Sequence, residues 1–448
     1  VREGLRMAAD GVRAAGSGLG RRARPWGTIC GTMVLAAAAC GALSAAGALP
    51  ALGGAYAALS LRLEHQLHTQ APAPPARIAL GPHGRDIRFA GEIREGAADR
   101  LAALLAAHPA VTRIHLTSEG GLVAEASAIG DLIAARGLST YVPDYCVSAC
   151  TLAFVRGTTR ALVTDGRLGF HAPYDPGLFG QVVQADAAVE RAAYVAAGVD
   201  PSFAAEALGV ASDSLWIPDP ARLVRARVAT ELVDTDRFPD STLDDDPSLA
   251  GARAAVLRAL PLLEALAGRD EILSALASGY LDGYRAGISE GEALDRLRAR
   301  AARAIRQVLQ GADAATWTEL GGLVLRAMRQ VGPDADPDAD PDAGPDACLA
   351  IGGTGDLLAL QDVLSAPSLS PDRPAADAVR TLLARAARQA GPGGREAGPA
   401  PAARLPRDCA GLIAAYAEAL ARPGAGGAVR ALASQGVRPA REAAALPR

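Results

Sequence analysis

Between Ala76 and Phe238 the chain alternates short extended segments with helical ones, and this alternation constrains its fold more than any other feature. Strands that recur between helices of about ten to fifteen residues are typical of βαβ units, whose strands form a largely parallel, buried sheet. We therefore expect an α/β domain. The expected strands are 77–80, 87–91, 113–117 and 140–142, and the expected helices are 97–107, 123–136 and 149–155.

The N-terminal part of the chain predicts a membrane anchor. Several arginines precede an uncharged stretch from Pro25 to Leu61, and its residues 29–49 supply the roughly twenty apolar positions that a membrane-spanning helix needs. Because positive flanks stay cytoplasmic, the bulk of the chain should lie in the periplasm. A cleaved signal peptide is the alternative. The expected segments are a cytoplasmic N-terminus (1–25), a single-pass inner-membrane anchor (26–50) and a juxtamembrane stem (51–75).

Beyond residue 246 the composition changes to helices rich in Ala, Leu and Arg. An acidic Pro-Asp-Ala repeat interrupts them, and we interpret it as a linker because it cannot bury enough apolar area to fold. Cys348 and Cys409 follow it and are candidates for a long-range disulfide in an exported protein. The expected parts are an α/β domain at 76–238, a helical region at 246–331, the linker at 332–347 and a C-terminal helical region at 348–448.

Charge and composition exclude several functions. The chain has 45 basic and 49 acidic side chains and a formal net charge of −4, which argues against a nucleic-acid binder. All the basic residues are Arg, because the sequence contains no Lys. A guanidinium does not deprotonate, so a Walker phosphate loop, a Schiff-base cofactor site and a Ser/Lys protease dyad are excluded. We expect no cofactor and no metal site.

Glycines mark the first of two strand-to-helix turns that point to chemistry. Gly120 and Gly121 follow the expected strand at 113–117 and precede the expected helix at 123–136. Glycines in such a turn let backbone N–H groups point outward at a helix N-terminus, where they stabilise developing negative charge. Taken alone, the motif is more often an ordinary tight turn.

A serine lies in the second turn. Ser148, flanked by Cys146 and Cys150, stands where a short strand gives way to the helix at 149–155. Its hydroxyl is a poor nucleophile until a base removes its proton, and His171 is the only histidine downstream of it. In an oxidising compartment the two cysteines form a candidate redox pair that stiffens or blocks the turn. The alternative treats them as small buried apolar residues.

These motifs resemble, in order and spacing, the Clp-type serine proteases of the Clp/crotonase superfamily, over about residues 76–236. The branch they resemble most is exported and membrane-anchored. The resemblance implies a repeated ββα spiral core, a homo-oligomer, and a peptide or unfolded protein as substrate. The matching segments are 116–123, similar to the family's strand followed by Ser-Pro-Gly-Gly-x-Val, then the helix with Asp131, the turn at 146–154 and the extended segment 169–173.

The resemblance also implies a role for each site residue. The family's acid lies ahead of an aromatic residue and an Ala-rich helix, where Asp213 matches best and Asp219 is the fallback. Glu119 stands where the family has a proline, so the chain departs from the family pattern at the substrate-binding edge. A non-catalytic docking or assembly module of the same fold is the competing hypothesis. The implied assignments are Ser148 as nucleophile, His171 as general base, the backbone N–H groups of Gly121 and Ala149 as oxyanion hole, and Gly120 in support.

Overall fold

The computed structural model describes residues 74–176, 182–332, 345–366, 373–390 and 405–435. The expected cytoplasmic segment, anchor and stem lie outside these residues, as does most of the acidic linker. Among the helices that are described, none is both long and apolar enough to cross a bilayer. The chain divides into two compact units, and almost all the described residues belong to the unit formed by Pro74–Tyr174 and Gln184–Arg448.

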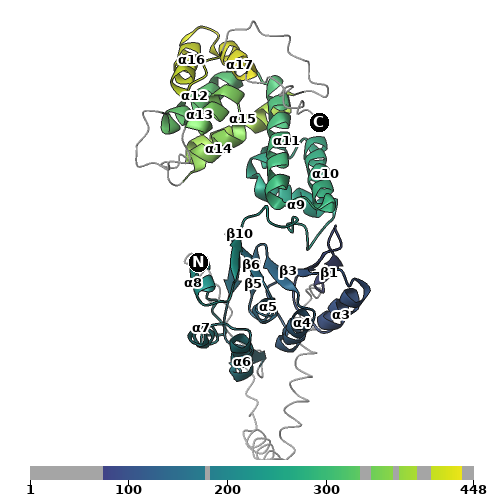
Figure 1. Cartoon of the computed structure of the whole chain (residues 1–448). Helices are drawn as coiled ribbons and strands as arrows, with labels where there is room; N and C mark the ends of the chain where they lie inside the picture. Colours follow the sequence, from purple (N-terminus) through teal and green to yellow (C-terminus); the bar gives the residue numbers. More distant parts are fainter. Residues whose placement is uncertain (1–73, 177–181, 333–344, 367–372, 391–404, 436–448) are drawn as a thin grey trace, which may run out of the picture. The chain divides into compact units, whose positions relative to one another are not determined.

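A six-stranded sheet forms the N-terminal part of this unit (Figure 1). Its first two strands are antiparallel, and every other neighbouring pair is parallel. The turn between those two strands is closed by the N–H of Gly81, which donates to the carbonyl of Asp86 at 2.8 Å. The prediction of a largely parallel α/β sheet is confirmed. The strands in spatial order are β1 (Arg77–Leu80), β2 (Asp86–Ala90), β3 (Arg113–Thr117), β4 (Ser139–Val142), β6 (Arg160–Val163) and β10 (Glu231–Val233).

Helices cover one face of the sheet. α3 (Ala97–Ala107) and α4 (Val123–Ala135) bury their apolar sides in one core with Ile87 and Phe89 of β2. Gly130 lets α4 approach α5 (Cys150–Phe154) closely, because a Cβ there would lie 3.2 Å from the Leu152 carbonyl. The other elements of this part are the parallel pair β5 (Tyr145–Val147) and β7 (Arg167–Gly169), the pair β8 (Tyr174–Pro176) and β9 (Val182–Gln184), and the helices α6 (Ala188–Ala196), α7 (Pro201–Ala207) and α8 (Pro220–Arg225).

The C-terminal part is helical, as predicted, and its helices share one hydrophobic core. The helix α11 (Glu290–Gln310) shows how the sequence specifies this packing, because Leu297, Ala301 and Ile305 recur every four residues and are all buried. A disulfide between Cys348 and Cys409 joins α13 to α16, so the pairing considered from the sequence is present. The elements are α9 (Leu249–Ala259), a 3-10 helix (Pro261–Leu266), α10 (Asp270–Ala286), α11 (Glu290–Gln310), α12 (Ala314–Val331), α13 (Pro345–Thr354), α14 (Leu357–Ser365), α15 (Arg373–Gln389), α16 (Cys409–Ala421) and α17 (Ala425–Gln435).

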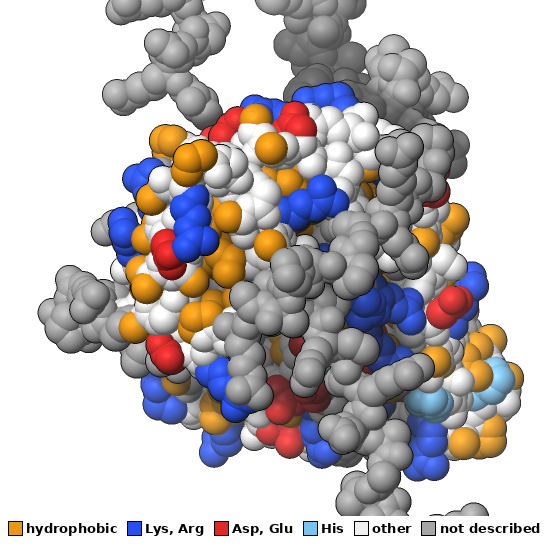
Figure 2. Space-filling view, turned by 90° about the horizontal axis from the view of Figure 1, so that it is seen from above, with side chains coloured by type: hydrophobic (Ala, Val, Ile, Leu, Met, Phe, Trp, Pro, Cys, Tyr) orange, Lys and Arg blue, Asp and Glu red, His pale blue; other side chains and the backbone are white. Residues whose placement is uncertain are grey.

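Cationic and apolar side chains are neighbours on the surface. On the face shown in Figure 2, hydrophobic side chains gather on the left, and basic side chains lie among them. Every one of these basic side chains is an arginine, since the chain has no Lys. A guanidinium is more weakly hydrated than an ammonium and is therefore better suited to apolar surroundings.

Candidate active site

The turn after β5 holds Ser148 in an uncommon backbone conformation. Its φ is 55°, in the left-handed region that residues other than glycine rarely adopt, and such positions cluster at functional sites. Two contacts hold the turn. The N–H of Ser148 donates to the carbonyl of Gly169 at 2.8 Å, and the carbonyl of Ser148 accepts from the N–H of Thr151 at 3.0 Å. The surrounding chain therefore fixes the serine in this conformation, with its side chain half-buried.

The glycine turn lies directly against the serine turn. A Cβ on Gly120, whose φ is +98°, would lie 2.8 Å from the Cβ of Ser148 and 2.8 Å from the carbonyl of Val147. A Cβ on Gly121, whose φ is +140°, would lie 2.2 Å from the carbonyl of Ile93. Both positions thus require glycine, and the two motifs, which are far apart in the sequence, meet in the structure.

Two backbone donors are free beside Ser148. Within the described residues, neither the N–H of Gly121 nor that of Ala149 donates a hydrogen bond. Gly121 is exposed, so its N–H can be reached from solvent. Unpaired N–H groups next to a nucleophile are what an oxyanion hole requires, because they can stabilise the negative charge that develops on an attacked carbonyl oxygen.

His171 lies on the chain segment next to the serine. β5 and β7 pair in parallel with Val147 opposite Gly169, so Ser148 and His171 follow paired residues on adjacent strands. The Nδ1 of His171 lies 2.8 Å from the carbonyl of Ala172. A carbonyl only accepts, so Nδ1 donates this hydrogen bond, and in the neutral ring the lone pair then lies on Nε2, which is the tautomer a general base needs. No hydrogen bond joins Ser148 to His171 within the part of the chain that is described.

The two candidate acids lie elsewhere. Asp213 is exposed, and its carboxylate accepts from the hydroxyl of Ser214 at 3.3 Å; no contact with His171 occurs among the described residues. Asp219 caps α8, where it accepts from the N–H of Arg222 at 2.8 Å. The structure therefore places the glycine turn against Ser148 and Ala149, sets His171 two residues beyond the strand that pairs with β5, and orients its imidazole with a backbone carbonyl. The role of Asp213 stays a prediction.

A disulfide brackets the serine. Cys146 and Cys150 are bonded to each other, with their Cα atoms 5.4 Å apart, and both are fully buried. Of the two alternatives left open by the sequence, the structure shows the bridge. It connects the strand before Ser148 to the helix after it and so restricts the movement of the turn.

Apolar side chains are exposed around this turn. Leu122 follows the second glycine and is 51% exposed, while Leu215 and Ile217 are 49% and 46% exposed. The segment with these last two runs beside the strand before His171, because Phe170 and Trp216 exchange backbone hydrogen bonds of 2.9 and 3.0 Å. Exposed apolar groups near a potential site are candidates for contact with a ligand.

A cavity of about 530 Å³ opens at the carboxyl ends of the parallel strands. Glu119, Asp144 and Asp165 line it from the segments after β3, β4 and β6, Asp244 lines it from the loop after β10, and Glu290 lines it from α11. Burial raises the pKa of Glu290 to about 7 and that of Asp244 to about 6. The cavity is therefore acidic and in part protonated near neutral pH. Among the described residues no group of side chains has the arrangement of a metal site.

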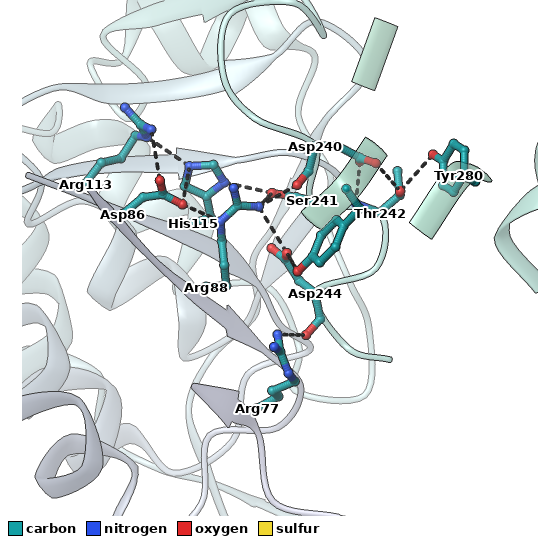
Figure 3. Close-up of polar contacts among 11 residues, drawn as sticks. Arg77, Asp86, Arg88, Arg113, His115, Asp240, Ser241, Thr242, Asp244 and Tyr280 are labelled. Carbon is teal, nitrogen blue, oxygen red and sulfur yellow. Dashed lines mark hydrogen bonds and ion pairs between the residues drawn. The ribbon is translucent and has the colours of Figure 1, made fainter. Parts of the chain in front are cut away.

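The other face of the sheet carries a buried polar cluster that the sequence analysis missed (Figure 3). Asp86 and Arg88 lie on β2 and His115 lies opposite Arg88 on β3, each at most 1% exposed. Successive side chains of a strand point to opposite faces of the sheet. Asp86 and Arg88 therefore lie in the polar cluster, while Ile87 and Phe89 enter the core on the helix-covered face. Charged residues at every second position of a predicted strand are the signal that could have found this cluster.

Residues beyond the sheet neutralise the cluster. The hydroxyl of Tyr284 on α10 donates to Asp244 at 2.8 Å. The guanidinium of Arg88 also forms an ion pair with the carboxylate of Asp86, two residues earlier on β2. The loop after β10 therefore ties the sheet to the helical part through buried charges. Three hydrogen bonds from Arg88 Nη1 reach this loop, to the carbonyl of Asp240 at 2.6 Å, the hydroxyl of Ser241 at 2.8 Å and Oδ1 of Asp244 at 3.1 Å.

Burial decides the protonation state of His115. Desolvation lowers its pKa well below the usual value, and the positive charges of Arg88 and Arg113 lower it further. The imidazole is therefore neutral, and its Nδ1 shares a hydrogen bond of 2.7 Å with the hydroxyl of Ser241. The side chain of His115 has no access to solvent, so we assign it a structural role.

Comparison with known proteins assigns no family. No protein-family model and no curated protein matches the chain. Among solved structures, ClpP1 from Listeria monocytogenes is 16% identical with a TM-score of 0.29, and a point mutant of it is 15% identical with a TM-score of 0.28. Both comparisons cover 34% of this chain and 93% of the other. A Ser-to-Ala mutant of the 1510-N membrane-bound stomatin-specific protease is 15% identical with a TM-score of 0.28, over 33% of this chain and 77% of that one.

Proposed function

We propose that residues 76–236 are a serine peptidase of Clp type, with a Clp/crotonase-like core. The observation that carries the proposal is the backbone of Ser148, held at φ 55° beside the free N–H groups of Gly121 and Ala149. The order and spacing of the motifs around it, which resemble those of Clp-type proteases, support the same conclusion. A buried core serine would need neither the strained turn nor the unpaired donors.

The proposed reaction is acyl transfer. Nε2 of His171 takes the proton of the Ser148 hydroxyl as its oxygen attacks the carbonyl carbon of a peptide bond. The N–H groups of Gly121 and Ala149 stabilise the resulting oxyanion. His171 then gives the proton to the leaving amine, and water releases the acyl group by the reverse sequence. The carbonyl of Ala172 accepts from Nδ1 throughout and stabilises the imidazolium.

The substrate and the location are part of the proposal. Exposed Leu122, Leu215 and Ile217 suit an extended peptide or an unfolded segment with apolar side chains. We place the domain in the periplasm as a homo-oligomer, anchored in the inner membrane through residues 29–49. Two disulfides in the described part of the chain fit an oxidising compartment. Fusion of a periplasm-dependent reporter to the C-terminus tests the orientation, and an inactive reporter there would contradict it.

A fluorophosphonate probe, which reacts with activated serines, tests the activity. The full chain should be labelled, Ser148→Ala should abolish labelling, and His171→Ala should reduce it by about 100-fold or more, since general-base catalysis contributes that much. Ser127→Ala, which removes an exposed serine of α4, is the matched control and should be labelled like the wild type. Absence of labelling in the folded wild type, both with and without reductant, would contradict the proposal.

One observation favours the competing function. No hydrogen bond joins Ser148 to His171 among the described residues, and no described carboxylate orients the imidazole. A Clp-like docking or assembly module without catalysis would look the same. Catalytic hydrogen bonds of free sites are often long and tighten when substrate binds. A peptide aldehyde, which adds covalently to an activated serine, should therefore bind the wild type and not Ser148→Ala; equal binding to both would favour the docking module.

A further inference from the structure

The helical part contains a second cavity, which the proposed reaction does not use. Its volume is about 500 Å³, within the range of small-molecule sites. Trp317, Leu320 and Val324 line it from α12 at a spacing of three and four residues, so one face of that helix forms an apolar wall. Leu357 and Val429 extend the wall from α14 and α17. Such a cavity suits a ligand with a largely apolar body.

Two arginine side chains without counterions line this cavity. Arg303 and Arg306 line it from the same side of α11, three residues apart. In the described residues, neither guanidinium has an ion pair or a hydrogen bond, whereas Arg296 and Arg298 of the same helix pair with carboxylates. Two unpaired guanidiniums beside an apolar wall favour a ligand with an anionic group.

The cavity wall also contains an unsatisfied donor. Trp317 is 6% exposed, and its indole N–H has no hydrogen-bond partner in the described structure. Buried polar groups without a partner are rare, and each calls for an explanation such as a ligand or an ion. The hydroxyl of Tyr416, which lines the same cavity, is by contrast satisfied by the carbonyl of Gly352 at 3.2 Å.

We propose that this cavity binds an amphiphilic carboxylate of the fatty-acid type. The acyl chain lies against the apolar wall of α12, and the carboxylate pairs with Arg303 and Arg306. The indole N–H of Trp317 is a further donor available to the acid. The inference is independent of the peptidase, since none of these residues belongs to the site around Ser148.

Other occupants fit less well. A peptide would bring several N–H and C=O groups against the apolar wall of α12, α14 and α17, which is costly. The C-terminal residues 436–448 of this chain contain three arginines and one glutamate, so their charge does not complement two arginines. An acyl chain with one acidic end presents its only polar group where the donors are.

Photolabelling tests the proposal. The full chain is reconstituted in lipid nanodiscs, which avoid a competing detergent, and exposed to palmitate that carries a diazirine. The cross-linked residues are mapped by mass spectrometry. We expect labelling in residues 314–331 or 425–435 that is at least fivefold stronger than with the matching alcohol, because charge-assisted hydrogen bonds require the carboxylate. Equal labelling by both, or labelling only elsewhere, would overturn the proposal.

Matched variants separate the contributions of charge and space. Arg303→Gln combined with Arg306→Gln should reduce labelling at least fivefold, whereas Arg296→Gln, outside the cavity on the same helix, should leave it unchanged. Ala433→Phe fills the cavity and should reduce labelling without removing a charge. Thermal unfolding checks that each variant is folded. If removal of residues 436–448 raises labelling more than tenfold, the tail itself occupies the cavity and the proposal is wrong.

Discussion

Substitution of Gly120 by Ala tests the packing that joins the two motifs of the candidate site. The new Cβ would lie 2.8 Å from the Cβ of Ser148, a distance that real Cβ contacts do not show. Gly96 is a matched control, because its φ of +79° is also positive and nothing lies within 4 Å of its missing Cβ. The difference between the two Gly→Ala variants therefore isolates the contact with Ser148 from the backbone strain.

The expected losses in the free energy of unfolding follow from the backbone strain and from the contact with Ser148. A left-handed conformation costs an alanine about 1–2 kcal/mol, and the less flexible unfolded chain offsets about 0.4–1 kcal/mol of that. Gly96→Ala should thus lose about 1 kcal/mol in the free energy of unfolding. Crowding adds about 1–3 kcal/mol at Gly120, so that Gly120→Ala should lose about 2–4 kcal/mol.

The assay combines urea denaturation with fluorophosphonate labelling. Gly120→Ala displaces the serine turn from its backbone donors, and loss of one such donor typically slows acyl transfer by about 10²–10³. We expect a labelling rate at least 100-fold lower for Gly120→Ala and a normal rate for Gly96→Ala. If the two variants have the same stability and the same labelling rate, the reasoning from this contact is refuted.

Three further perturbations test other parts of the structure. Arg88→Met removes the cation that pairs with two buried carboxylates, Asp86 and Asp244, and should lower the free energy of unfolding by about 3–5 kcal/mol in urea denaturation; a loss below about 1 kcal/mol would contradict the ion pairs. Burial raises the pKa of Glu290 to about 7, so the folded state retains a proton and stability should fall as the pH rises from about 5 to 7; Glu290→Gln should remove the fall above about pH 6 and leave the part below it, to which the raised pKa of Asp244, about 6, contributes. Replacing Cys348 and Cys409 by Ser removes a bridge across 61 residues and should cost about 4 kcal/mol, seen as a lower Tm under non-reducing conditions.

Much of the fold could be predicted because the relevant signals are local. The strands 77–80 and 113–117 and the helix 97–107 have the predicted ends, since apolar periodicity and flanking turn residues define them. The second strand begins one residue earlier than predicted, at Asp86. A carboxylate normally marks the end of a buried strand, but this one is buried because Arg88 pairs with it. That partnership depends on tertiary structure and has no local signal.

The candidate site, too, could be predicted only where its residues have local sequence signals. Turn glycines and a serine between a strand and a helix have sequence signals, and the structure places Gly120 against Ser148. The third member of the triad has no local sequence signal, because a carboxylate is assigned to that role by its distance from His171 and not by its neighbours in the chain. The short strand expected before Ser148 is β5, but its parallel pairing with β7 depends on tertiary structure and has no local signal.

The loop that neutralises Arg88 lies after the last strand of the sheet, and its own partner Tyr284 lies further on, in α10. Truncating the chain after the peptidase-like part, for instance at residue 238, would expose the guanidinium of Arg88, the imidazole of His115 and the carboxylate of Asp86 on an uncovered face of the sheet. Such a fragment should be insoluble even if its catalytic turn is correct. The smallest autonomous piece therefore extends at least through α10, which carries Tyr284.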